Sequence, residues 1–268
     1  MLSIIIQDYG WQNALYYIAL VGFILAAVIL LLFRERRPAL PQISETPSSG
    51  HGVLLWSVMQ SPGVWVLALY AGIMVGVVVI GFSELYNVIF TQKILGLGQE
   101  QAASITILTF IGIAVGGPLH GAISSLFRKN TSWMRISAVI TLLLFATVPL
   151  FIVTGVKSVW LVRVLYFSLG FFVSSMLLSF DVVRNIVPSS LHGTAFALIN
   201  LTISLIGFAF QIILGHLESA LQFMDSPVHP LRSYTLSLLL IALPLLIAVL
   251  LVIFKVKPNN TEPLLDPN

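Results

Sequence analysis

The chain has 268 residues, of which 58% are hydrophobic and only 9% are charged, and its mean hydropathy is +1.01. An average soluble domain carries roughly 25% charged residues, so this composition excludes an ordinary water-soluble surface and places most of the chain in lipid. The net charge of +3 would suit a nucleic-acid binder, but the basic residues lie beside apolar stretches and are better explained as signals of membrane topology.

Seven apolar stretches follow one another along the chain. A hydrocarbon core about 30 Å thick needs about 20 residues of helix, and most of the stretches reach that length. The unbroken apolar run Ala19–Phe33 excludes the alternating polarity of a membrane β-barrel. We therefore expect an all-α membrane protein with helical spans at 12–33, 64–90, 102–126, 136–155, 158–180, 193–217 and 233–254.

The first residues do not form a span. Leu2–Ile6 is too short to cross a membrane, and neither a basic region nor a small-residue cleavage site identifies a signal peptide. We expect the chain to begin inside an extracytoplasmic hairpin and to be a piece of something longer, either a truncated remnant or one product of a split gene.

Charge predicts the orientation. Lys93, Lys157 and Arg232 fall on one side of an alternating path, and Arg163 lies inside a span. The positive-inside rule then predicts an external N-terminus and a cytoplasmic C-terminus. We expect the protein to lie in a cell membrane, such as the bacterial inner membrane. The other nine of the thirteen basic residues fall on the opposite, cytoplasmic side: Arg34, Arg36, Arg37, Arg128, Lys129, Arg135, Arg184, Lys255 and Lys257.

Two polar segments divide the chain. Pro38–Gly52 has the Pro, Ser and Glu content of a flexible linker, and the residues after Lys255 have the composition of a disordered tail. The expected parts are a helix in 1–37, a cytoplasmic linker in 38–62, a six-helix bundle in 63–255 and a cytoplasmic tail in 256–268.

Several motifs resemble those of a known family. Gly10-Trp11-Gln12 opens a helix that ends in Arg34-Glu35-Arg36-Arg37, and a linker and six more helices follow. This arrangement resembles the middle and second half of a major facilitator superfamily transporter, with helices equivalent to 6–12. Three further stretches support the resemblance: Phe82-Ser83-Glu84-Leu85-Tyr86-Asn87, Gly116-Gly117-Pro118 with Gly121 and Ser124, and Pro188 with Gly193-Thr194-Ala195 and Asn200.

The resemblance implies a fold and a function. The stretches are similar to those of bacterial carriers of amino acids, peptides or organic anions and of lysosomal dipeptide carriers. By this resemblance, six of the spans form the C-terminal bundle of the family's fold, and a missing N-terminal bundle or a complementary half would have to complete it.

The second span carries the first candidate site. Glu84 and Asn87 are one turn apart and are expected on one face, with Tyr86 and Thr91 extending the polar patch. An ionisable group inside a span costs about 2.5–3.5 kcal/mol and is a functional hypothesis by default. Glu84 could exchange a proton or bind a cationic group, or it could be simply hydrated at the outer interface. Glycines at 72, 76 and 81 would let this helix bend or pack closely.

Arg163 is the one basic residue inside a predicted span. It could hold a substrate carboxylate, with Tyr166 on the same face at i+3. Alternatively, its long side chain reaches water from about one turn inside the boundary.

Asp181 and Arg184 are spaced i, i+3 at the predicted cytoplasmic end of the fifth span. The two could form an ion pair that closes the inner mouth in one conformation. A hydrated pair that contributes little is the alternative.

His120 follows Pro118 in the third span and could relay protons, since histidine titrates near neutrality. The alternative is a packing residue with one hydrogen bond. The nearby patterns Gly112-x-x-x-Gly116 and Gly117-x-x-x-Gly121 indicate close helix packing rather than phosphate binding.

Two amides, Asn200 and Gln211, share a face of the sixth span. We expect Asn200 to contact substrate and Gln211 to join helices.

Together with the family resemblance, the polar residues within the spans predict the C-terminal half of a proton-coupled symporter for a small polar solute, working by alternating access and inactive by itself. The expected site residues are Glu84, Asn87, Tyr86, Arg163, Tyr166 and Asn200 for substrate or coupling, Asp181 and Arg184 for gating, and His120 for proton relay. We expect no enzyme activity, cofactor, metal or nucleic acid, and lipid, solute and protons as partners. The alternative is a seven-helix receptor or scaffold.

Overall fold

A computed structural model describes residues 2–32, 51–127, 130–155, 157–221 and 232–256, and every regular element in these ranges is a helix. The chain divides into two units, Met1–Ser48 and Ser49–Asn268. Most of the predicted linker, nearly all of the predicted tail and the basic loop at 128–129 lie outside the described residues. Seven helices are long and apolar enough to cross a membrane, as the sequence predicts.

The first unit contains one helix, α1 (Leu2–Leu32), which is interrupted at Gly10. Gly10 has a φ of 80°, a conformation that favours glycine, and the membrane-spanning part runs from Gln12 to Leu32. Among its described side chains only Ala14 is buried. An apolar helix exposed on nearly all sides is stable only in contact with lipid or other helices.

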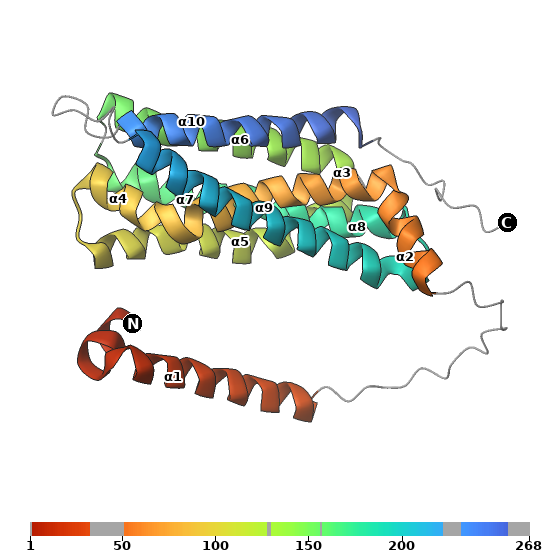
Figure 1. Cartoon of the computed structure of the whole chain (residues 1–268), viewed down its shortest axis with the longest axis horizontal. Coiled ribbons are helices and arrows are strands. Elements are labelled where there is room, and N and C mark those ends of the chain that lie inside the picture. The colour runs from red at the N-terminus through yellow and green to blue at the C-terminus, as the bar shows by residue number, and fades with distance from the viewer. Residues whose placement is uncertain (1, 33–50, 128–129, 156, 222–231, 257–268) are drawn as a thin grey trace. The chain divides into compact units, whose positions relative to one another are not determined.

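The second unit contains six spans, and its helices run roughly side by side along one axis (Figure 1). The third, fourth, sixth and seventh predicted spans are the continuous helices α5, α6, α9 and α10, whereas the second and fifth are each built from three segments. In chain order the elements of the spans are α3 (Pro62–Ala71), η1 (Gly72–Tyr86), α4 (Asn87–Leu95), α5 (Gln99–Phe127), α6 (Asn130–Thr154), α7 (Val159–Val173), η2 (Ser174–Leu177), α8 (Leu178–Arg184), η3 (Ser189–Leu191), α9 (His192–Leu221) and α10 (Arg232–Phe254).

A further short helix, α2 (His51–Gln60), lies in the stretch that the sequence assigns to the linker 38–62. It crosses the direction of the spans (Figure 1). Val58 is fully buried, and the Trp65 indole donates to the Met59 carbonyl at 2.6 Å. The structure therefore differs from the sequence prediction because apolar residues inside this segment pack against the bundle.

Glycines bring two pairs of spans close together. The pairs α5 with α7, α9 with η1 and α10 with α6 have the most extensive contacts. A Cβ atom at Gly76 would lie 2.8 Å from the Gly207 nitrogen, so η1 and α9 touch backbone to backbone there. Gly112 makes a similar approach to α7, whereas Gly121 has open space around it. Close packing at the first α5 pattern and along η1 thus confirms the sequence prediction.

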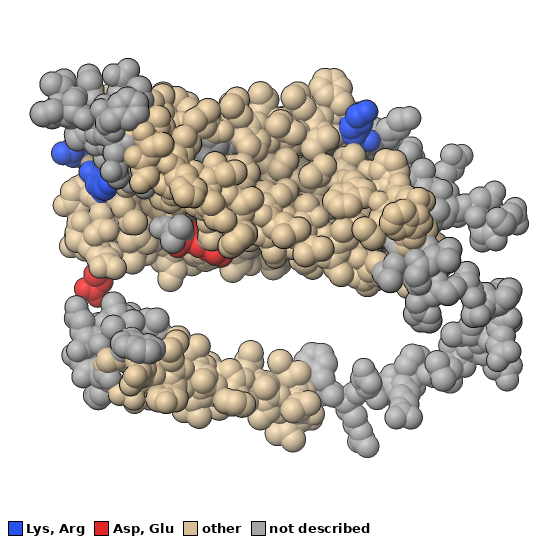
Figure 2. Space-filling view, in the orientation of Figure 1, with Lys and Arg blue, Asp and Glu red and all other residues tan. Residues whose placement is uncertain are grey.

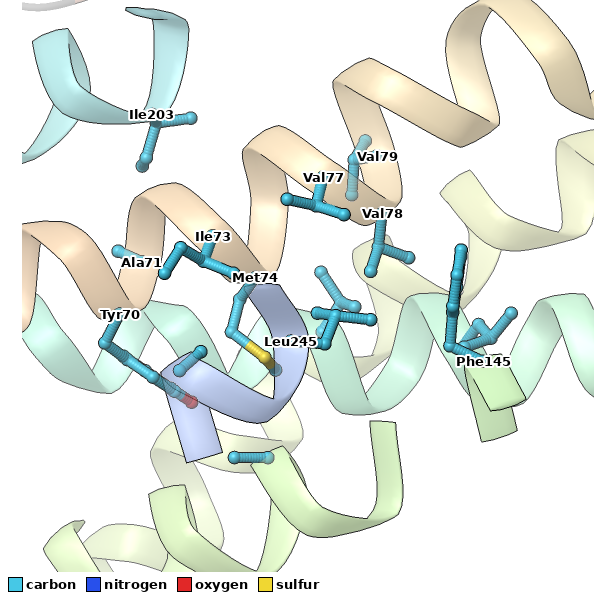
Figure 3. Close-up of a cluster of buried hydrophobic side chains, with 14 of the residues drawn as sticks. Tyr70, Ala71, Ile73, Met74, Val77, Val78, Val79, Phe145, Ile203 and Leu245 are labelled. Atoms are coloured by element: carbon cyan, nitrogen blue, oxygen red, sulfur yellow. The ribbon is translucent and has the colours of Figure 1, made fainter. Parts of the chain in front are cut away.

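The core lies where η1 meets α6, α9 and α10. Figure 3 shows Met74, Val78, Phe145 and Leu245 among the side chains that meet there, all of them buried. Outside this core, large apolar side chains such as Leu143 and Leu240 are exposed. Figure 2 shows a mostly uncharged surface on the bundle, with basic groups near its two ends. A buried core inside an apolar surface is the arrangement of a multi-pass membrane protein.

Candidate functional site

The second span has an irregular winding at its centre. Gly72–Tyr86 forms 15 residues of π-helix, and regular α-helix resumes at Asn87. Side chains support the widened turns: Ser83 donates to the Val78 carbonyl at 2.7 Å, and Gln211 of α9 donates to the Ile80 carbonyl at 3.0 Å. Gln211 thus joins two helices, as predicted. Insertions of π-helix occur frequently at functional sites.

Asn87, at the end of the π segment, is a buried amide without a hydrogen-bond partner. Its side chain is 0% exposed, and neither amide atom is paired within the described residues. One turn later, Thr91 Oγ1 and Tyr166 Oη share a hydrogen bond of 2.9 Å between α4 and α7. An unpaired buried amide costs about 1–3 kcal/mol, so its presence here needs a reason beyond stability.

Replacing Asn87 with leucine, which branches at Cγ as asparagine does, should raise the free energy of unfolding by about 1 kcal/mol or more, because it removes two unpaired polar atoms. Thr91→Val is the matched comparison and should destabilise the fold, since it leaves Tyr166 Oη without its partner. Thermal unfolding of the purified chain, followed by tryptophan fluorescence, measures both. A lower melting temperature for Asn87→Leu would show that the amide has a structural bond.

Glu84 and Tyr86 do not share the environment of Asn87. The Glu84 side chain is exposed, and Tyr86 is half-buried with its hydroxyl beside Gly215 of α9. The expected common face relied on regular α-helical spacing, which the π winding replaces. The span thus presents a carboxylate on its surface and an amide inside the bundle.

Arg163 and Tyr166 also face different surroundings. Arg163 is exposed one turn after the start of α7, where Ser158 caps the helix, whereas Tyr166 is 1% exposed and lies edge-on to Phe82. Asn200 is exposed on α9. Within the described residues no hydrogen bond or ion pair joins Glu84, Arg163 and Asn200, so the bundle leaves these three side chains open on its surface.

Asp181 and Arg184 form the predicted ion pair at 3.7 Å on α8. Both side chains are about half exposed, and the guanidinium also lies over the Phe196 ring at 5.4 Å. His192 of α9 contacts the Arg184 carbonyl at 3.2 Å. An exposed pair of this kind contributes about 0–1 kcal/mol, so its value would lie in positioning rather than in stability.

His120 is buried and both ring nitrogens are engaged. Trp133 Nε1 donates to Nδ1 at 2.5 Å, and Nε2 lies 2.7 Å from the Phe171 carbonyl. Because an indole only donates, Nδ1 must accept, and the ring is neutral with its proton on Nε2. The sequence analysis considered two roles for His120, proton relay and packing. These contacts correspond to the packing role.

Two basic residues that the sequence treats as topology signals have specific contacts. Arg135 of α6 donates to the carbonyls of Val252 and Val256 at 3.2 and 2.6 Å, and so caps the end of α10. Lys93 donates to the Tyr234 hydroxyl at 2.6 Å. Nothing in the local sequence indicates these partners, which are more than a hundred residues away.

Small cavities lie inside the described part of the bundle. Two narrow cavities flank Phe90, one beside Thr91 and Tyr166 and the other beside Tyr86 and Tyr234, and each has space for about one water molecule. No cluster of metal-binding side chains occurs among the described residues. Neither of these two cavities is large enough to hold a solute.

A family model described as Major Facilitator Superfamily matches residues 1–211. No curated protein matches the chain.

Proposed function

The chain belongs to the major facilitator superfamily of membrane transporters, and from this we propose that its six-helix bundle is the C-terminal half of a proton-coupled secondary transporter for a small polar solute. The match to residues 1–211 covers the first span and most of the bundle. The two interior cavities beside Phe90 are too small for a solute, which supports a solute path on the bundle's surface, facing a second set of helices.

Transport of this kind needs two bundles that rock about a shared site near the midplane. Substrate and coupling ion drive the motion because they bind the two states with different affinities. The six spans of the second unit form one bundle. We propose that a complementary half completes the pathway, and that the chain by itself does not transport.

The observation that carries the proposal is the second span, where a carboxylate and an unpaired amide lie in an apolar helix with a π-wound segment. Glu84 is exposed on the bundle and would carry the coupling proton. Asn87 has no hydrogen-bond partner among the residues that the structure describes, and it would gain partners when the winding of the helix changes. Both features cost free energy, and a transport role explains why they are kept.

The remaining candidates suit a zwitterionic solute such as an amino acid or dipeptide; an organic anion would use the same cation. Arg163 would bind a carboxylate and Asn200 would hydrogen-bond the solute, while Tyr86 lies beside the path. Tyr166 would act from inside the bundle, through its bond to Thr91. Asp181 and Arg184 would form part of the gate on the predicted cytoplasmic side.

Uptake into proteoliposomes tests the proposal. The chain is reconstituted alone and together with an N-terminal bundle of the same family, and labelled amino acids, dipeptides and organic anions are offered with and without an inward proton gradient. We expect gradient-dependent accumulation of one solute class only when both halves are present. No uptake of any class by the complete assembly, with both halves shown to be folded, would contradict the transporter proposal.

A further inference from the structure

The fifth span is broken at its centre. The α-helix α7 ends at Val173, a 3₁₀ segment covers Ser174–Leu177, and α8 continues to Arg184. Short 3₁₀ segments inside a helix often mark hinges. The part beyond the break carries the Asp181–Arg184 pair.

Side chains from other spans hold this break. The Phe171 carbonyl, one turn before it, accepts hydrogen bonds from Ser174 Oγ and from His120 Nε2–H, both at 2.7 Å. Ser175 is joined to Tyr70 of α3 at 3.3 Å. Three spans therefore meet at the point where the fifth span changes its winding.

His120 is the residue that links the break to the rest of the bundle. Its ring accepts a hydrogen bond from the Trp133 indole of α6. The centroid of the ring lies 4.8 Å from that of the Phe171 ring of α7. The backbone of α5 is also close, because a Cβ atom at Gly116 would lie 2.7 Å from the Phe171 oxygen. One donor and one acceptor on a single side chain thus join α5, α6 and α7.

We propose that His120 is a positioning residue, which fixes the break at Ser174–Leu177 and thereby the placement of α8 with its ion pair. His120 acts as a neutral hydrogen-bond partner and not as a proton carrier. The role of α8 as part of a gate rests on the proposed function. The claim that His120 fixes the position of α8 does not depend on it.

The test uses the absence of cysteine in the chain, which allows selective spin labelling. Asn185→Cys at the end of α8 and Leu126→Cys near the end of α5 place labels at two exposed positions. Pulsed electron paramagnetic resonance on the full chain in lipid nanodiscs then measures the distance between α8 and α5. The variants compared in this background are His120→Ala, His120→Gln and Trp133→Phe.

We expect His120→Ala to broaden or shift the distance distribution, because the Phe171 carbonyl loses its hydrogen bond from α5. His120→Gln should restore the parental distribution, since an amide can donate to Phe171 and accept from Trp133. Trp133→Phe should give a smaller change, because it removes only the hydrogen bond to His120 Nδ1 and keeps an aromatic ring at position 133. Met134→Ala removes buried volume beside Trp133 without removing a hydrogen bond, and should lower thermal stability while the distribution stays parental.

Three results would overturn the proposal. The first is a parental distribution for a folded His120→Ala variant, and the second is a His120→Gln variant that matches His120→Ala. The third concerns proton transfer. Glutamine cannot titrate, so a complete transporter with His120→Gln should keep its proton-driven uptake, and a loss of uptake with an unchanged distribution would instead assign His120 to proton transfer. The distance measurement needs no transport, so failure of the proposed function leaves it valid.

Discussion

Gly112→Ala should strongly destabilise the bundle. A Cβ atom at this position would lie 2.8 Å from the Phe171 nitrogen and nearer still to the Phe167 carbonyl oxygen. Both are backbone atoms of α7, so the clash is relieved only when two spans move apart. Overpacking a well-packed core typically costs about 1–3 kcal/mol, and we expect this substitution to reach or exceed the upper value.

Gly121→Ala is the matched control, because it makes the same chemical change on the same helix. Nothing lies within 4 Å of a Cβ atom there. Alanine is the better helix former by about 1 kcal/mol, so this variant should be neutral or more stable. Tryptophan-monitored melting and the elution profile of the detergent-solubilised chain measure both. Equal melting temperatures for the two variants would show that α5 and α7 are not in backbone contact at Gly112.

Glu84→Gln should abolish accumulation driven by a proton gradient in the complete transporter. Glutamine has nearly the same shape as glutamate but cannot bind and release a proton, so coupling is lost while solute binding and exchange can continue. Uptake with a gradient and exchange without one are measured in the same proteoliposomes. We expect the first to fall to background and the second to persist.

Glu100→Gln is the matched control, because it removes one carboxylate from the bundle at a position with no proposed role in coupling. Glu100 is exposed in the first turn of α5, at the same end of the bundle as the α4–α5 connection. The Glu100→Gln variant should leave gradient-driven uptake unchanged. Glu84→Asp keeps an ionisable group and should retain part of the gradient-driven uptake. Undiminished gradient-driven uptake by Glu84→Gln would remove Glu84 from the coupling role.

The sequence was most informative about the membrane spans. Lipid requires each span to be an apolar helix of about 20 residues, and this requirement can be tested within a single stretch of sequence. The limits of the predicted spans accordingly agree closely with Gln12–Leu32 and with most of the other spans in the structure. Glycine patterns such as Gly112-x-x-x-Gly116 were equally readable, because small residues at this spacing allow two helices to approach.

The π and 3₁₀ segments within the spans could not be predicted from the sequence. No residue pattern in Gly72–Tyr86 marked a π-helix, and its effect was to separate Glu84 from Asn87, which regular spacing places on one face. The break at Ser174–Leu177 was likewise unexpected. Such departures are stabilised by side chains of other helices, including Gln211 and His120, and so depend on the packed bundle.

By itself, therefore, the sequence determined the number, type and approximate limits of the membrane helices, together with the rare polar residues within them. The tertiary structure alone decided which of these residues are paired: His120 with Trp133 and Phe171, and Arg135 with the end of α10, while Asn87 stays buried without a partner among the described residues. The physical reason is that a span's length and polarity are properties of one segment. Hydrogen bonding of a side chain depends on which face of its helix meets a segment far away in the chain.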